Sequence, residues 1–192
     1  MRFPFDERKA AQAAAYLLKR HHGRLNYMKL IKLLYLADRK ALLDLGNPIT
    51  GDRMVSMPKG PVLSGILDLI NWGKRRSETS VWLQYVSEPI GYDVTLAAEG
   101  ISIDELDLLS ESERQILDEI DEEYGRVDKW SLVELTHRLP EWHDPRGSSL
   151  LIDPAEILRE EGRSEEEIRR LAQNANRALF LHDLDSFEIE PE

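Results

Sequence analysis

One stretch, residues 26–46, constrains the fold of this chain more than any other. Its apolar residues recur at steps of three, four and seven, the spacing of a helix with an apolar face; they are Tyr27, Leu30, Ile31, Leu34, Ala37, Ala41, Leu42 and Leu45. Three further leucines widen that face and leave a narrow polar stripe, which we expect around Lys29, Lys32, Arg39 and Lys40. A helix with so wide an apolar arc must be covered from more than one side. We therefore place it at the centre of the core.

The ends of this central helix are marked by residues that cap or stop helices. Asn26 precedes it and can accept a hydrogen bond from one of the first free amides. Gly46 follows it and tolerates a positive φ, and Pro48 prevents the helix from resuming. The sequence thus predicts one long buried helix over these residues.

Two groups of motifs in this chain match the signatures of one known protein family. The first group is Lys29–Ala37, Gly46–Pro48 and Lys59–Val62. The second follows in the same order, with Leu135-Thr136-His137 and then Pro140-Glu141-Trp142. With these motifs the chain resembles the Panacea domain, also called the SocA-like antitoxin domain and found in phage-associated proteins. The two signatures span roughly residues 6–145 of a chain that we expect to be one domain over residues 1–192. Residues 146–192 would then be a helical C-terminal extension.

The resemblance implies a function as the antitoxin of a toxin–antitoxin system. Such a protein neutralises a cognate toxin, usually encoded beside it, by direct stoichiometric binding, and it is neither an enzyme nor dependent on a cofactor. Two alternatives stay open. The chain could be an adaptor that delivers its partner to a protease, or a hydrolase-like enzyme that uses His137.

The residues that carry the resemblance are expected to be structural or partner-binding. Antitoxins that serve different toxins need variable contact surfaces, so shared motifs more readily define a scaffold than a particular interface. The signature residues are Lys29, Lys32, Leu33, Tyr35, Gly46, Pro48, Lys59, Gly60, Pro61, Thr136, His137 and Trp142.

Composition is typical of a cytoplasmic globular protein. The 192 residues are 42% hydrophobic and 32% charged, enough for one domain with a real core. No apolar run of about 18 residues predicts a membrane span, and residues 1–20 lack the pattern of a signal peptide. The absence of cysteine removes disulfides and thiolate metal sites.

Charge is distributed unevenly along the chain. Residues 1–80 contain 15 Lys and Arg against 7 Asp and Glu, a net charge of +8, whereas residues 81–192 contain 10 against 29, a net charge of −19. One interpretation is a pair of solvated faces; the other is an acidic surface that attracts a basic partner. Nucleic acid is disfavoured as the main ligand, because the larger acidic charge opposes its approach.

Outside the central helix the pattern predicts an α+β fold that is mainly helical, with a small antiparallel sheet. We expect an extended segment over residues 49–57 and two paired strands, 81–86 and 92–96. Pro61 is placed in the first turn of a helix ending at Trp72. Other helices are expected from Asp6 to a cap at Gly23, and over residues 111–124, 128–139, 154–161 and 165–182, with a frayed acidic tail from Asp183.

His137 is the residue that most resembles a catalytic one, because Thr136, His143 and Asp144 lie close to it in sequence. Against this, adjacent Thr and His side chains on a helix point apart, and the chain has no nucleophile elbow. The favoured interpretation is that Thr136 or His137 hydrogen-bonds a buried backbone group and holds this turn against the core. A contact with a partner protein is the second interpretation of these residues, and catalysis is the least favoured. Lys29 and Lys32 are expected to lie on a solvated stripe.

Overall fold

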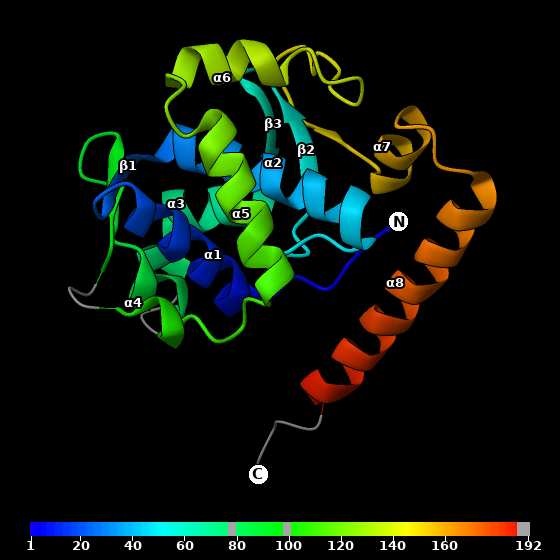
Figure 1. Ribbon diagram of the computed structural model, residues 1–192, viewed down its shortest axis with the longest axis horizontal. Coiled ribbons are helices and arrows are strands. Elements are labelled where there is room, and N and C mark those ends of the chain that lie inside the picture. Colours follow the sequence, from blue (N-terminus) through cyan, green and yellow to red (C-terminus); the bar gives the residue numbers. More distant parts are fainter. Residues whose placement is uncertain (77–79, 98–100, 188–192) are drawn as a thin grey trace.

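A computed structural model describes residues 1–76, 80–97 and 101–187 of the chain. Its centre is α2 (Tyr27–Leu45), around which the other elements are arranged (Figure 1). Asn26 accepts a hydrogen bond from the Met28 amide at the start of the helix, and Gly46 ends it with a φ of 79°. Leu30, Leu33 and Leu42 are fully buried. The prediction of a capped helix at the centre of the core is confirmed.

The described residues form eight α helices, a 3-10 turn and five short strands, so the expected α+β class is confirmed. Besides α2, the helices are α1 (Glu7–Arg20), α3 (Ser64–Arg76), α4 (Trp82–Tyr85), α5 (Glu111–Tyr124), α6 (Lys129–Thr136), α7 (Pro154–Glu160) and α8 (Glu165–Phe187). The 3-10 turn η1 covers Ile103–Glu105. The capping box that Ser110 and Glu113 predicted opens α5.

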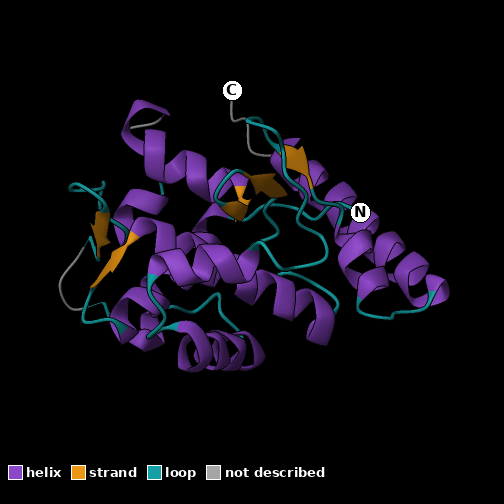
Figure 2. Cartoon of the chain, turned by 90° about the horizontal axis from the view of Figure 1, so that it is seen from above, coloured by secondary structure: helices purple, strands orange, loops and turns teal. Residues whose placement is uncertain are grey.

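The strands form two small antiparallel sheets that lie apart from each other (Figure 2). In the first, β1 (Arg24–Asn26) pairs with β4 (Asp93–Thr95), so that Leu25 lies opposite Val94. In the second, β2 (Met54–Met57) lies between β3 (Gly60–Leu63) and β5 (Leu150–Leu151). Met57 pairs with Gly60, so Pro58 and Lys59 form a two-residue turn. This turn carries part of the candidate site.

The prediction for Pro61 was wrong. Residues 60–63 form an edge strand rather than the first helical turn, and α3 begins three residues later, at Ser64, and continues to Arg76 rather than ending at Trp72. An edge strand tolerates proline because one side of its backbone needs no ladder hydrogen bond. The carboxylate of Asp52 caps α3 instead, accepting from the amides of Gly65 and Ile66 at 2.9 and 2.8 Å.

The prediction of a strand over residues 81–86 was also wrong. Residues 82–85 form the short helix α4, and only Val86 makes an isolated bridge, to Leu96. Trp82 is fully buried, and its amide donates to the Glu7 carboxylate at 2.9 Å. Packing of one large side chain against α1 thus outweighs the β propensity of this segment. The second strand exists as β4 but pairs with β1, which the sequence pattern did not reveal.

The polar stripe of α2 is narrower than expected. Lys32 is only 1% exposed and therefore does not lie on a solvated stripe. Asp38, which we did not single out, is fully buried on the same helix. Its carboxylate accepts from the Thr50 amide and hydroxyl, at 3.0 and 2.5 Å. Burial raises the pKa of Asp38 to about 7.

Ion pairs within the fold account for much of the uneven charge. Cations from the first 80 residues pair with acids from the rest of the chain: Lys9–Glu113, Arg20–Asp118, Arg20–Asp121, Arg24–Asp93, Arg39–Glu141, Arg39–Glu161 and Lys40–Glu119. Several of these pairs join α1 or α2 to α5. The acidic half of the sequence therefore partly neutralises the basic half, instead of presenting its whole charge to a partner.

The C-terminal segment forms two helices, as expected. α8 packs near the end of α2 through Leu171, which lies beside Gly46, and extends away from the other helices at its C-terminal end (Figure 1). The expected fraying from Asp183 is wrong for residues 183–187, which are helical, and residues 188–192 lie outside the described residues. Within the described ranges, no helix combines the length and the apolarity that a membrane span requires.

Candidate binding site

Seven of the signature residues form a cluster centred on Gly60, at the start of β3. They come from α2, from the turn between β2 and β3, from β3 itself, and from the end of α6 and the loop after it, and they are Lys32, Lys59, Gly60, Pro61, Thr136, His137 and Trp142. A Cβ added to Gly60 would lie 2.6 Å from the Thr136 hydroxyl and 2.8 Å from the Lys32 ammonium nitrogen. The fold thus brings together two signatures that are some 75 residues apart in sequence.

Lys32 is the charged residue at the centre of this cluster. Its Nζ donates to the carbonyl oxygen of Pro61 at 2.6 Å. Burial lowers its pKa to about 7, because the charged form of the amine loses its hydration. Among the described residues, no carboxylate forms an ion pair with it. This lysine is therefore a buried amine with a pKa near neutrality and one acceptor among the described residues.

His137, which also lies beside Gly60, packs against Trp142. The two ring centroids are 4.1 Å apart, and the indole nitrogen of Trp142 donates to the Met57 carbonyl oxygen at 3.1 Å. Burial lowers the pKa of His137, and the neighbouring charge of Lys32 lowers it further. These contacts join the loop after α6 to the β2–β3 turn.

The arrangement of Thr136 does not match that of a catalytic nucleophile. Its hydroxyl donates to the carbonyl oxygens of Leu132 and Val133, at 2.9 and 3.1 Å, within its own helix. The Nε2 atom of His137 is buried and has no hydrogen-bond partner in the described part of the chain. No hydroxyl–imidazole pair of the kind that activates a nucleophile is therefore formed here.

The other signature residues belong to the scaffold. Leu33 and Tyr35 are fully buried on α2, Pro48 is buried just after it, and Gly46 supplies its left-handed end. The Tyr35 hydroxyl donates to the carboxylate of Glu141 at 2.8 Å, so α2 also holds the loop that carries Trp142. Lys29 donates to the Gly125 carbonyl oxygen and joins α2 to the end of α5.

A pocket of about 340 Å³ opens beside the cluster. Most of its wall is apolar, and Lys32, Lys59 and Asn71 supply the polar groups; the remaining lining residues are Tyr27, Met28, Ile31, Met57, Pro58, Val62 and Leu67. A largely apolar cavity with a few polar groups is the usual form of a ligand site. Lys32 thus belongs both to the signature cluster and to the wall of this pocket.

Exposed aromatic residues and lysines surround one side of the pocket. Trp130 is 54% exposed and Tyr92 is 68% exposed. Lys129 lies over both rings, at 5.6 and 5.5 Å from their centroids, and Lys59 lies 5.9 Å from that of Trp130. Tyr27, from the pocket wall, is 6.2 Å from Tyr92. We call Tyr27, Lys59, Tyr92, Lys129 and Trp130 the aromatic rim.

Trp130 lies within the expected helix 128–139, and Tyr92 is the first residue of the expected strand 92–96. Both side chains are exposed, because Trp130 lies in the first turn of α6 and Tyr92 precedes β4. The sequence does hold one signal of this. Trp130 follows the capping residue Asp128 and stands between Lys129 and Ser131, outside the apolar run that starts at Leu132.

The family model described as antitoxin SocA-like, Panacea domain, matches residues 30–143, which include both groups of signature residues. The chain belongs to this family. No curated protein and no solved structure matches it. The match begins within α2 and ends just after Trp142, so it includes the Gly60 cluster, Trp130 and all of the pocket wall except Tyr27 and Met28.

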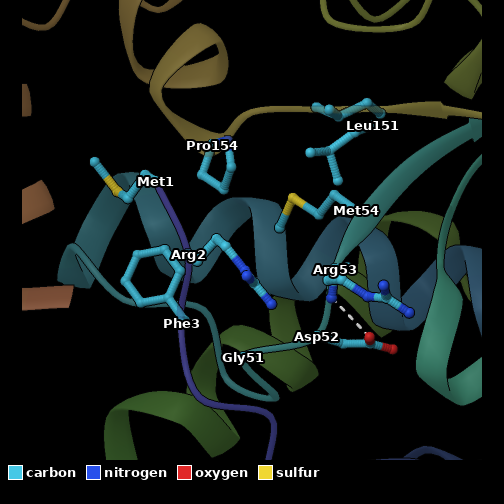
Figure 3. A pocket seen from close by; sticks show the side chains of 10 residues that line it. Met1, Arg2, Phe3, Gly51, Asp52, Arg53, Met54, Leu151 and Pro154 are labelled. Carbon is cyan, nitrogen blue, oxygen red and sulfur yellow. Dashed lines mark hydrogen bonds between the residues drawn. The ribbon is translucent and has the colours of Figure 1, made fainter. Parts of the chain in front are cut away.

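The chain has a second pocket, of about 270 Å³, which shares no lining residue with the first (Figure 3). Met1, Met54, Leu151 and Pro154 line one part of it, and Asp52 and Arg53 another. The Asp52 carboxylate already accepts from the amides that open α3, and it lies 2.6 Å from the Arg53 amide. The cations that line this pocket, Arg2 and Arg53, are exposed, whereas the first pocket is lined by a buried lysine.

Replacing Gly60 with alanine should destabilise the domain by roughly 2–4 kcal/mol. Its φ of +87° strains any other residue by about 1 kcal/mol, and the new methyl group would crowd Lys32 and Thr136. Gly147→Ala is the matched control, since Gly147 has a φ of +89° but an added Cβ there meets no described atom within 4 Å. Urea unfolding of both variants measures the difference. Equal losses would show that the cluster is not tightly packed around Gly60.

Proposed function

We propose that this Panacea domain neutralises a protein toxin by binding it in a fixed ratio. The observation that carries the proposal is the match to the SocA-like antitoxin family over residues 30–143. The cognate toxin is expected to be encoded beside the antitoxin and to meet it in the cytoplasm. The proposal needs no cofactor and assigns no catalytic step to His137.

The aromatic rim supports the proposal by offering a surface of suitable composition. Tryptophan and tyrosine are enriched among the residues that contribute most to the affinity of protein interfaces. Their rings are exposed, lie beside Lys129 and do not line the pocket, so they remain accessible to a partner. We therefore assign the aromatic rim as the centre of the toxin-binding surface.

The charge of the aromatic rim also supports its assignment as the toxin-binding surface. Acidic residues from the C-terminal half form ion pairs with Arg20, Arg39 and Lys40. The rim, in contrast, carries Lys59 and Lys129 against aromatic faces. The surface of the toxin that contacts the rim should accordingly be acidic, and its association should slow as salt rises. This differs from the basic partner that the sequence alone suggested.

Titrating the domain into an assay of the neighbouring toxin tests the mechanism. Inhibition should saturate at a small whole-number ratio, and the two proteins should elute together, as expected for an interface of roughly 1,200–2,000 Å² in total. Protection by a hundredfold smaller amount, with no complex recovered, would overturn the proposal and favour an enzyme. Loss of the toxin only when a protease is present would favour an adaptor.

Three variants test the surface in the same assay. Trp130→Ala and Tyr92→Ala should each weaken toxin binding by roughly 30-fold or more, the loss typical of a central interface aromatic. Phe180→Ala on α8 is the control, because that ring is 63% exposed and lies outside the rim. Binding that is unchanged in both rim variants, or lowered equally by the control, would place the interface elsewhere.

A further inference from the structure

The pocket beside Gly60 combines two features that seldom occur together. Its wall is largely apolar, yet one of its lining residues is a buried lysine. The ammonium group of Lys32 has three N–H bonds, and the structure assigns one of them to the carbonyl oxygen of Pro61. Among the described residues no acceptor is found for the other two N–H bonds, so they remain for a ligand that reaches Lys32 from the pocket.

An anion is the ligand that this arrangement stabilises. A buried charge without a counter-ion is costly, and the described residues supply Lys32 with none. The groups near Lys32 do not supply the missing negative charge: Lys59 lines the same pocket, and His137, whose pKa is lowered by burial and by Lys32, is an imidazole. A carboxylate that entered would regain the ion pair that the fold leaves unmade.

The rest of the pocket selects an apolar group next to that anion. Seven of the ten lining residues are apolar or aromatic, among them Ile31, Val62 and Leu67. An Asp or Glu side chain brings only one or two methylene groups to such a wall. The last residue of a polypeptide brings a whole apolar side chain and a carboxylate on the same carbon atom. It therefore fits both features of the pocket at once.

The position of the pocket indicates that its ligand is part of a protein rather than a free small acid. Tyr27 and Lys59 belong to both the pocket wall and the aromatic rim. A chain whose last residue filled the pocket would run out over Tyr92 and Trp130, where the rim can bind the residues before it. A free acid would use the pocket and leave the rim uncovered.

We propose that this pocket binds the C-terminal residue of a partner protein, with its apolar side chain on the wall and its carboxylate on Lys32. The inference deepens the proposed function, and it rests on that function for the identity of the partner as the toxin. The chemistry of the pocket does not depend on the proposed function, and peptides can test that chemistry without the toxin.

The first test uses the wild-type domain and two labelled hexapeptides of one sequence. The sequence ends in leucine, with a glutamate earlier in the peptide, and the two peptides differ only in a free carboxylate or an amide at the end. Fluorescence anisotropy should show the free acid binding roughly 10- to 100-fold more tightly, the usual gain from one charge-assisted contact. Equal binding of acid and amide would overturn the proposal. If hexanoate binds as tightly as the acid peptide, the inference that the ligand is part of a protein is overturned.

The second test replaces the cation. Lys32→Met keeps the length and apolar volume of the side chain, and a buried ionic group replaced in this way often leaves a fold as stable or more stable. The variant should bind the acid and amide peptides equally. Lys40→Met is the control: Lys40 lies on the same helix but is paired with Asp44 and Glu119, and its variant should keep the preference for the acid. A retained preference in Lys32→Met would overturn the assignment.

Combining both assays separates this inference from the proposed function. If the toxin is neutralised but the peptides show no preference for the acid, the pocket proposal fails and the antitoxin proposal stands. If the acid peptide binds through Lys32 but the neighbouring toxin is not bound, the pocket proposal stands and the antitoxin proposal fails.

Discussion

Replacing Glu141 with alanine is expected to lower the free energy of unfolding by roughly 3–5 kcal/mol, the usual cost of removing one partner from a buried ion pair. The side chain of Glu141 has no exposed area. Its carboxylate accepts from the Tyr35 hydroxyl at 2.8 Å and from two Arg39 nitrogens at 2.8 and 3.3 Å. Alanine would leave the buried tyrosine without an acceptor. Arg39 would keep only its exposed pair with Glu161.

Two further variants make this prediction specific. Glu141→Gln keeps an acceptor for Tyr35 and should cost less than alanine, about 1–3 kcal/mol. Glu165→Ala breaks an exposed pair with Arg159, which solvent screens, and should cost much less than Glu141→Ala. Chemical denaturation of the wild type and the three variants compares their free energies of unfolding. If Glu141→Ala and Glu165→Ala unfold alike, the triad does not stabilise the loop after α6.

Leu34→Ala should cost roughly 2–5 kcal/mol, because it removes three heavy atoms from the most enclosed helix of the domain. Leu34 is 1% exposed, and α2 packs against α1, α5, α6 and β3. Neighbours on so many sides cannot all move inward, so a cavity should remain. Total stabilities of proteins are about 5–15 kcal/mol, and a loss of this size should therefore also lower the yield of folded protein.

Leu45→Ala provides the comparison on the same helix. Leu45 lies in the last turn of α2 and is 43% exposed, so its truncation should cost less than about 1 kcal/mol. Thermal unfolding measures both variants. A Leu34→Ala protein that melts at the wild-type temperature would show that α2 is not the centre of the core.

Sequence alone was sufficient for the features that depend on residues close together along the chain. Asn26 and Gly46 bound the central helix, and Ser110 with Glu113 opens α5, because a cap is a contact over two to four residues. The apolar period of residues 27–45 likewise predicted a core helix. The order of the signature motifs indicated the family, and the match over residues 30–143 confirmed it.

Where a distant contact outweighs a local preference, the sequence prediction was wrong. Pro61 is compatible with a helix start, but pairing of Gly60–Leu63 with β2 places it in a strand. Residues 82–85 favour a strand, but Trp82 finds its buried site only as part of a helical turn against α1. β1 is too short to be recognised without β4, its partner almost 70 residues later.

The candidate site shows the same division most clearly. The motifs around Lys32, Gly60 and His137 could be read from the sequence, but nothing in their spacing showed that the three side chains meet at one glycine. Nor could a helical period tell a solvated lysine from a buried one, since Lys29, Lys32 and Lys40 are alike in sequence. Burial is set by what covers a residue, and the cover of Lys32 comes from the β2–β3 turn and the end of α6. The sequence determined the helix that carries this lysine; only the tertiary structure made it a buried cation beside a pocket.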